Sequence, residues 1–406
     1  MRVLVATHTS LEVNSGEERT LRDIAQQLVE RGHEVRFANY EGLHGNERRI
    51  TTDQVREQLG SVALVSVPPM ALFGGIVAIP SLRGIRMLAE SVRWADVVVF
   101  GQFYGYDLTM FALSRALHRP LVCSQANALF RRYRNLVRDA VQEGYERTVG
   151  VPLLRRFAGV RVCNSADVRF LRALGCSRVM LLYPPNTDFS ALPGSEALPT
   201  AQQQLVLRLS KDPRFKFLLA GRMTHQKGLD LLADALLRLG RERPSVSSEF
   251  AFLFAGTTEL PSALHAVAGR HPGLVENLGS LSPPTLAAVM RTVDAVLMTS
   301  RYESFGRVAA EGQSLGKPVL GTDIPGLREV VASGVTGTLI DSWSADALAA
   351  AILRFRELRD SHPADWAAMG TAALTSYRER FSNPHVRAQM EEFVTELERL
   401  PMRRTG

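Results

Sequence analysis

Glu303 and Glu311 stand eight residues apart in the second half of the chain, with Ser-Phe-Gly directly after the first of them. An apolar run, Ala295–Met298, precedes this segment. On one helix, residues eight apart are offset by about 80°, so the two carboxylates would not share a helix face. We therefore expect Glu303 to lie in a turn after a strand, and a helix to begin near Phe305 or Gly306.

Such a turn brings a carboxylate and the first N–H groups of a helix to the carboxyl end of a strand. Open α/β sheets bind their ligands at that edge, and the dipole of the helix favours an anion there. The alternative interpretation is a surface helix with two solvated glutamates. This motif alone does not separate the two interpretations.

A second turn carries cations where the first carries carboxylates. The apolar run Phe217–Ala220 leads to Gly221 and Arg222, and Lys227 stands next to Gly228, where the 3.6-residue apolar period of a helix begins. We expect this helix to end at Gly240. Two cations beside a helix N-terminus are typical of a diphosphate site, although two ordinary surface cations would give the same sequence.

Together the two turns resemble a known family. Gly221-Arg222 and Lys227-Gly228, followed by Glu303-Ser304-Phe305-Gly306 and Glu311, are similar to the retaining GT-B-fold glycosyltransferases of the glycogen-synthase and sucrose-synthase type (glycosyl transferases group 1, family four). The resemblance is specific from about Leu218 to Asp341, and the N-terminal half resembles the family in outline.

The resemblance implies an α/β chain of two Rossmann-like, doubly wound domains that face each other across a deep cleft. The length of 406 residues agrees, because one hydrophobic core rarely serves so long a chain. We expect an acceptor-binding domain over residues 1–186 and a nucleotide-sugar-binding domain over residues 187–380. Residues 381–406 would form a C-terminal helix that crosses back to the first domain.

The resemblance also implies roles for individual residues. Arg222, Lys227 and Glu303 would be catalytic. The other donor-binding candidates are Ser15, Gly16, Gly221, Leu281, Ser304, Phe305, Gly306, Arg307 and Glu311. The candidates on the acceptor side are Arg19, Gln125 and Asn127.

Two places in the N-terminal half depart from the family pattern. Ser15 replaces the first of two glycines that often meet the donor diphosphate, while Gly16 remains. Gln125 and Asn127 stand where relatives often place a histidine near the transferred sugar. An amide can hydrogen-bond a sugar hydroxyl, but it cannot act as a general base near neutral pH.

The implied reaction is transfer of a hexosyl unit from a nucleotide-diphosphate sugar to a hydroxyl acceptor. No second carboxylate is placed as a nucleophile, so the resemblance implies front-face attack with retention. The chain contains no Asp-x-Asp, so we expect no metal and no other cofactor, with cations holding the diphosphate. His225 is interpreted as a loop residue near the diphosphate rather than a catalytic one.

Composition limits the partners and the location. The three cysteines form no close pair, which argues against a disulfide framework or a zinc ribbon. The net charge is +7, but the basic clusters lack the stacking aromatics of nucleic-acid binding. We expect a cytoplasmic protein with possible peripheral contact to an anionic membrane through the N-terminal domain; a solvated helix face is the alternative. The basic clusters are Arg131, Arg132, Arg134 and Arg138, and then Arg155, Arg156 and Arg161.

One uncharged run, from Ser61 to Leu82, is long enough for a membrane span. It contains prolines and paired glycines, so we expect a strand, a turn and an apolar helix or loop instead. Two other functions stay open: a sugar epimerase on the same fold, and a non-catalytic binder of nucleotide sugars or lipid headgroups. The sequence leaves the base, the sugar, the acceptor and the oligomeric state undetermined.

Overall fold

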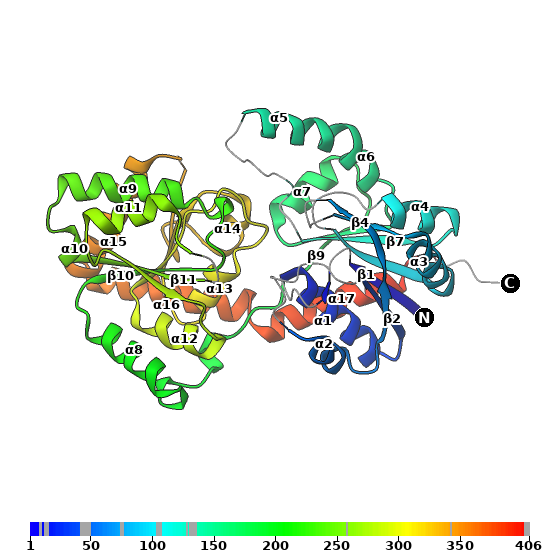
Figure 1. The fold of residues 1–406 in the computed structure, drawn as a ribbon, viewed down its shortest axis with the longest axis horizontal. Helices are drawn as coiled ribbons and strands as arrows, with labels where there is room; N and C mark the ends of the chain where they lie inside the picture. The colour runs from blue at the N-terminus through cyan, green and yellow to red at the C-terminus, as the bar shows by residue number, and fades with distance from the viewer. Residues whose placement is uncertain are drawn as a thin grey trace. The chain divides into compact units, whose positions relative to one another are not determined.

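The computed structural model describes residues 1–7, 10–11, 16–40, 50–73, 77–102, 108–126, 129, 136–256, 259–341 and 343–401. Contacts divide the chain into two compact units (Figure 1). Unit 1 contains Met1–Leu129, Leu136–Pro185 and Val386–Gly406, and unit 2 contains Asn186–His385. Each unit is built around its own parallel sheet.

The sheet of unit 1 has seven strands in the order β3-β2-β1-β6-β7-β8-β9. Every neighbouring pair is parallel, and the order reverses direction at β1, as in a doubly wound sheet. Its central strands are nearly continuous apolar runs, because both faces of a parallel sheet are covered. The strands are β1 (Arg2–Thr7), β2 (Glu34–Tyr40), β3 (Ala63–Val67), β6 (Val97–Gln102), β7 (Leu121–Gln125), β8 (Gly159–Val162) and β9 (Val179–Leu181).

Helices cover both faces of this sheet. Alternate residues of β1 face different cores: Val3 and Val5 pack with residues of α1, whereas Leu4 and Ala6 pack with residues of α3. The helices of unit 1 are α1 (Gly16–Glu30), α2 (Thr52–Leu59), α3 (Leu82–Trp94), α4 (Leu108–Ala116), α5 (Leu136–Tyr145), α6 (Val151–Leu154), α7 (Ser165–Ala173) and α17 (Asn383–Glu398), with a π-helical turn η2 (Glu146–Gly150) between α5 and α6.

The last helix, α17, belongs to unit 1 from Val386 onward. Its buried Met390, Phe393 and Leu397 join the core cluster that contains Leu21 of α1. Ion pairs also link the two helices, for example between Arg387 and Glu30 at 3.1 Å. The C-terminal helix therefore returns to the N-terminal sheet, as the sequence predicted.

The uncharged run Ser61–Leu82 forms strands rather than a helix. After β3 the chain makes an antiparallel hairpin of β4 (Pro69–Phe73) and β5 (Val77–Pro80), which pairs with neither large sheet. Within the described ranges, no helix has both the length and the apolar character that a bilayer span requires.

Unit 2 has a six-stranded parallel sheet in the order β12-β11-β10-β13-β14-β15. The order again reverses at its first strand, β10, which lies between β11 and β13. Stacked phenylalanines strengthen the centre, with the rings of Phe217 and Phe252 5.3 Å apart. The strands are β10 (Phe215–Ala220), β11 (Phe250–Ala255), β12 (Val275–Gly279), β13 (Ala295–Met298), β14 (Val319–Thr322) and β15 (Gly337–Ile340).

Figure 1 shows α9 and α11 on one face of this sheet, and α8 and α12 on the other. The helices of unit 2 are α8 (Thr200–Lys211), α9 (Leu229–Glu242), α10 (Val246–Glu249), α11 (Ser262–Arg270), α12 (Pro283–Thr292), α13 (Arg307–Gln313), α14 (Pro325–Val330), α15 (Ala345–Ser361) and α16 (Pro363–Arg380). Short 3₁₀ turns are η3 (Phe189–Ala191), η4 (Ser195–Ala197) and η5 (His225–Lys227).

The prediction of two Rossmann-like domains is confirmed, but three local predictions are wrong. One is the apolar helix or loop expected after β3, where the chain forms the hairpin of β4 and β5. Helix α9 does not end at Gly240; it continues to Glu242. A Cβ at position 240 would lie 2.0 Å from the His271 ring, so this glycine makes room for His271 inside the helix and does not end it. Arg161 is not part of a basic surface. It lies on β8, is fully buried, and donates to the Leu182 carbonyl at 2.6 Å and to Ser124 Oγ at 3.4 Å.

Candidate active site

The two turns singled out in the sequence are neighbours at one edge of the sheet of unit 2. β10 pairs with β13 through Phe217–Ala295 and Leu218–Val296. The segment after β10 and the segment after β13 therefore leave the carboxyl ends of adjacent parallel strands. This position is the point where the strand order reverses, which is where such sheets bind ligands.

Backbone and side-chain hydrogen bonds join the two segments closely. The Arg301 N–H donates to the Gln226 carbonyl at 2.8 Å, and Gln226 Nε2 donates to the Tyr302 carbonyl at 3.0 Å. Thr299 Oγ1 donates to the Lys227 carbonyl at 2.7 Å. These bonds fix both turns as one structural element.

Gly228 makes this close approach possible. It adopts a left-handed backbone, with φ +62°, and directly precedes α9. A Cβ at this position would lie 2.0 Å from the Thr299 carbonyl oxygen, so no larger residue fits without movement of the backbone. The sequence prediction that the helix begins at Gly228 agrees with this geometry.

Lys227 and Glu303 meet directly. Lys227 Nζ lies 2.6 Å from Glu303 Oε1, and Ser300 Oγ donates to the same carboxylate oxygen at 2.9 Å. Their side chains keep only 22% and 13% of their surface exposed. Because both are partly shielded from water, their attraction is stronger than that of an exposed pair.

Arg301 is buried close to this pair in the chain and binds residues of the other turn. Its guanidinium donates to the His225 carbonyl at 2.7 Å, forms an ion pair with Asp230 and lies 4.7 Å from the centre of the Trp343 ring. Burial alone would raise the pKa of Asp230, but the hydrogen bonds and charge of Arg301 outweigh it and leave that pKa below its ordinary value. Arg301 thus ties η5 to the first turn of α9.

A small pocket opens beside the ion pair. Its lining includes Arg222, Lys227 and Ser300, together with apolar side chains such as Leu219 and Met223. The Arg222 side chain is exposed and forms no ion pair with any described residue. The pocket therefore has one cation free to meet an anionic ligand and a second that is paired with a carboxylate.

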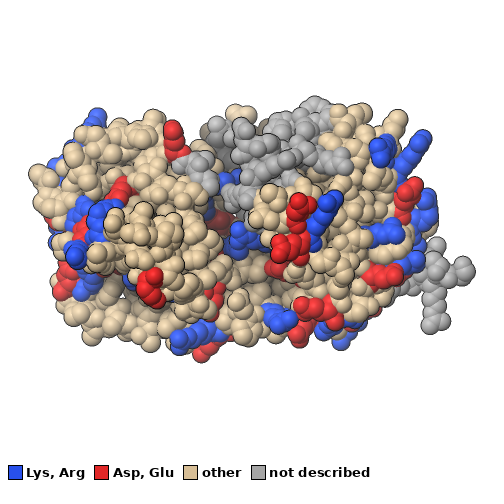
Figure 2. Space-filling view, turned by 60° about the horizontal axis from the view of Figure 1, so that its bottom comes forward, with Lys and Arg blue, Asp and Glu red and all other residues tan. Residues whose placement is uncertain are grey.

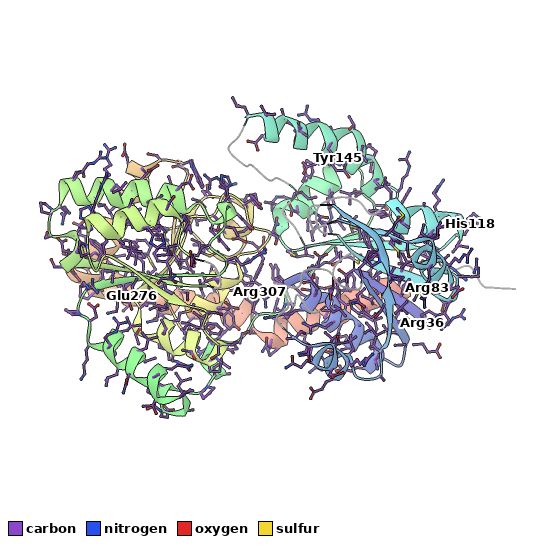
Figure 3. The ribbon with its side chains drawn as sticks, in the orientation of Figure 1. Arg36, Arg83, His118, Tyr145, Glu276 and Arg307 are labelled. Atoms are coloured by element: carbon purple, nitrogen blue, oxygen red, sulfur yellow. The ribbon has the colours of Figure 1, made fainter. Side chains whose placement is uncertain are left out.

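Helix α13 follows the glutamate turn as expected. Gly306 caps it with φ +92°, and Arg307 is the first helical residue (Figure 3). The Phe305 side chain is 1% exposed and packs edge-on against Phe381, with ring centres 5.4 Å apart. Phe305 can therefore meet a ligand only through its backbone.

The remaining donor-side candidates take positions around the same sheet edge. Gly221 has φ +122° and donates its N–H to the Ala255 carbonyl at 2.9 Å. Ser304 and Glu311 are partly exposed, before and within α13 respectively. Leu281 is partly exposed in the loop between β12 and α12, where Figure 3 shows Glu276 on the preceding strand.

The candidates in unit 1 lie on α1 and β7. Gly16 begins α1, and Arg19 is partly exposed one turn later. Gln125 is the last residue of β7 and is 6% exposed. Ser15 and Asn127 lie outside the described residues.

Sequence reasoning missed three residues of this site, Asp230, Ser300 and Arg301. They form hydrogen bonds and an ion pair with partners three to 76 residues away. The one local signal for Arg301 is that it is the first charged residue after the uncharged run 295–300. In the described part of the chain, no group of three His, Cys, Asp or Glu side chains could hold a metal ion.

Comparison with known proteins assigns both halves of the chain. Residues 15–187 match the model of the glycosyl transferase 4-like domain, and residues 214–357 match that of the glycosyl transferases group 1. Among curated relatives, D-inositol 3-phosphate glycosyltransferase of Segniliparus rotundus is 32% identical over 48% of this chain and 46% of its own length. The enzyme of the same name from Jonesia denitrificans is 38% identical over 30% of each chain. The matched region thus spans less than half of each of these relatives.

Solved structures agree over nearly the whole chain. The HepE protein of Anabaena in complex with UDP-glucose has a TM-score of 0.70 at 19% identity, covering 97% of this chain and 99% of its own. Sucrose-phosphate synthase from Thermosynechococcus elongatus has a TM-score of 0.70 at 17% identity, covering 98% and 99%. At such low identity these likenesses establish the fold.

Proposed function

The chain belongs to the group 1 glycosyltransferase family and has the GT-B fold, and from this premise we propose that it moves a hexosyl unit from a nucleotide-diphosphate sugar to a hydroxyl acceptor. The proposal includes retention of the anomeric configuration and independence from metal ions. It assigns donor binding to unit 2 and acceptor binding to unit 1.

The observation that carries the proposal is the contact of 2.6 Å between Lys227 Nζ and Glu303 Oε1. A cation for the leaving diphosphate and a carboxylate for the sugar would have to stand side by side, since the bond that breaks joins these two parts of the donor. Arg222 adds a second cation in the same pocket.

In this mechanism negative charge builds on the departing diphosphate, and Arg222 and Lys227 stabilise it. Preorganised charges of this kind are usually the largest contribution to catalysis in a site that excludes water. Glu303 accepts hydrogen bonds from hydroxyls of the sugar and orients it while the sugar gains oxocarbenium character. Lys227 moves from Glu303 toward the phosphate oxygens when the donor binds.

The other residues have binding roles. Glu311 accepts hydrogen bonds from the ribose hydroxyls, and the backbone from Ser304 to Arg307 contacts sugar and phosphate. Leu281 flanks the base. In unit 1, Gly16 approaches the donor, and Arg19 and Gln125 face the acceptor, whose hydroxyl attacks from the side that the diphosphate leaves.

Names of relatives suggest which ligands to test first. Structures of the HepE protein contain UDP or UDP-glucose, and the curated relatives are named for D-inositol 3-phosphate. UDP-glucose is therefore the first donor and inositol 3-phosphate the first acceptor. GDP-, ADP- and dTDP-sugars complete the donor set.

A thermal-shift screen of these nucleotide sugars tests the proposal, because a ligand that binds only the folded state raises its stability by mass action. We expect one nucleotide family to raise the melting temperature of the wild type, and the Lys227→Ala variant to lose that shift. If no nucleotide sugar stabilises the protein, the proposal fails.

The reaction products distinguish the transferase from two alternative functions. A non-catalytic binder would gain stability but never release nucleotide diphosphate. An epimerase would change the sugar without transferring it to an acceptor. For the transferase, the anomeric coupling of the product in NMR tests retention.

A further inference from the structure

The exposed face of α3 combines large apolar side chains with unpaired arginines. Leu82 is 77% exposed and Ile85 37% exposed, and Arg83, Arg86 and Arg93 are exposed on the same helix. Leu82, Arg86 and Arg93 follow one another at four and seven residues, so they form one stripe along the helix. The opposite face, with Leu88 and Val92, is buried against the sheet.

The cations of this stripe are available to a partner. Arg83, Arg86 and Arg93 form no ion pair with any residue of the described ranges. Glu90 is the acidic residue on this helix. Figure 2 shows that basic and acidic side chains lie close to one another in several places on the visible face.

The hairpin beside α3 extends the apolar surface. Met70 of β4 is 67% exposed, and Pro69 pairs with Pro80, two residues before Leu82. The Ser81 hydroxyl donates to the Pro68 carbonyl at 2.9 Å, which fixes the hairpin base to the start of α3. A two-stranded hairpin is marginally stable alone in water, so an apolar environment would suit it.

Together these residues point to one partner. We propose that Met70, Leu82 and Ile85, with Arg83, Arg86 and Arg93, form a docking surface for an anionic lipid bilayer. Apolar side chains flanked by cations enter the boundary between headgroups and acyl chains, while the arginines attract the anionic lipids. Arg83, one of these arginines, is labelled in Figure 3.

Helix α5 also exposes apolar side chains, but its sequence lacks the excess of arginines that α3 has. Its Val137 and Val141 are exposed by 73% and 68%. It also carries Asp139 and Glu143, and Glu143 is paired with Arg147. The sequence of α5 has two acidic residues and one arginine, Arg138, whereas α3 has three arginines and one acidic residue. An anionic surface therefore attracts α3 more strongly than α5.

The docking surface deepens the proposed function, because it would bring a transferase to acceptors at a membrane. Only this role of the surface rests on the proposed function; the binding to lipid does not. Binding to vesicles and transfer to a water-soluble acceptor are separate measurements. Loss of vesicle binding with full transfer would reject the surface alone, and vesicle binding without transfer would reject the function alone.

The experiment is co-sedimentation of the full chain with vesicles of phosphatidylcholine alone or of phosphatidylcholine and phosphatidylglycerol in equal parts. We expect binding to the anionic vesicles that weakens as salt is added. The Arg83→Gln/Arg86→Gln variant should bind about tenfold more weakly, because each basic residue near the surface adds to the attraction. The Leu82→Ser/Ile85→Ser variant should bind more weakly than the wild type at every salt concentration.

Matched controls carry the same changes elsewhere. Arg241→Gln/Arg270→Gln, two exposed arginines of unit 2, removes equal charge and should leave binding unchanged, as should Val137→Ser/Val141→Ser on α5. The proposal is overturned if the wild type binds neither vesicle or both equally. It is also overturned if the control variants lose as much binding as the α3 variants. All variants should keep the wild-type melting temperature, since the substituted side chains are exposed.

Discussion

Lys227 and Glu303 lie 76 residues apart in sequence, and their charged groups are 2.6 Å apart in the structure. The sequence assigned them to different parts of a donor, the diphosphate and the sugar. Their contact pairs the two charges directly in this structure. In the proposed mechanism a diphosphate competes with Glu303 for the lysine, so we expect the effects of the two residues on activity to be coupled rather than independent.

The ion pair of Arg301 and Asp230 predicts a dependence of stability on pH. The pKa of Asp230 lies below its ordinary value in the folded protein. Its stabilising contribution is therefore complete above the unfolded pKa of about 4, and is lost as pH falls through the lower folded pKa. Urea unfolding should show Asp230→Asn less stable than the wild type at neutral pH, with the difference shrinking in acid.

Asp234→Asn is the control for this measurement. Asp234 is exposed on the same helix and has no ion pair with a described residue. Its variant should follow the wild type at every pH. A difference between wild type and Asp230→Asn that persists unchanged in acid would show that the carboxylate charge is not what stabilises this turn.

Gly228 predicts a large effect from a small substitution. Gly228→Ala introduces a Cβ 2.0 Å from a carbonyl oxygen at a left-handed backbone position. We expect it to lower the free energy of unfolding by at least about 2 kcal/mol. Gly269→Ala on α11, where no atom lies within 4 Å of the added Cβ, should instead stabilise by about 0.5–1 kcal/mol. Equal effects from both substitutions would contradict the close approach of the two turns.

The cysteines should be inert in the native protein. Cys123, Cys163 and Cys176 are all buried, and none of the three is in a disulfide. Burial, with the nearby Glu17 carboxylate, raises the pKa of Cys123 far above its ordinary range, and the thiolate is the reactive form. Ellman's reagent should react with all three thiols in denaturant and slowly without it. A thiol that reacts at once under native conditions would disprove the burial of that residue.

Metal removal should leave the reaction unchanged. In the proposed mechanism Arg222 and Lys227 supply the positive charge that a divalent cation would otherwise bring to the diphosphate. We therefore expect transfer rates with and without EDTA to be equal. A rate that falls with EDTA and returns with Mg²⁺ or Mn²⁺ would refute metal independence.

Local signals made much of the site predictable from the sequence. The start of α9 follows from Gly228, and the placement of Glu303 in a turn follows from the spacing to Glu311 and from Gly306. Each of these signals involves neighbours in the chain. The pairing of β10 with β13 in the parallel sheet then brings the two turns together. The resemblance predicted this fold correctly.

The features that the sequence did not predict depend on contacts between residues that are far apart in the chain. Arg301 pairs with Asp230 across 71 positions, and no local pattern announces such a partner. Gly240 looked like a helix end, but the nearby His271 ring requires a small residue inside the helix. Arg161 looked like surface charge, because its burial depends on distant partners, Ser124 on the neighbouring strand β7 and Leu182 directly after β9.

The most direct test of the whole account is release of nucleotide diphosphate by the purified protein. The donor is the nucleotide sugar that stabilises it, and the acceptor pool includes inositol 3-phosphate. We expect the wild type to release product, and Lys227→Ala and Glu303→Ala each to lose about a hundredfold or more. The double variant should lose less than the product of the two losses, because the side chains act together. Full release by either single variant would contradict the central claim that this pair performs the transfer.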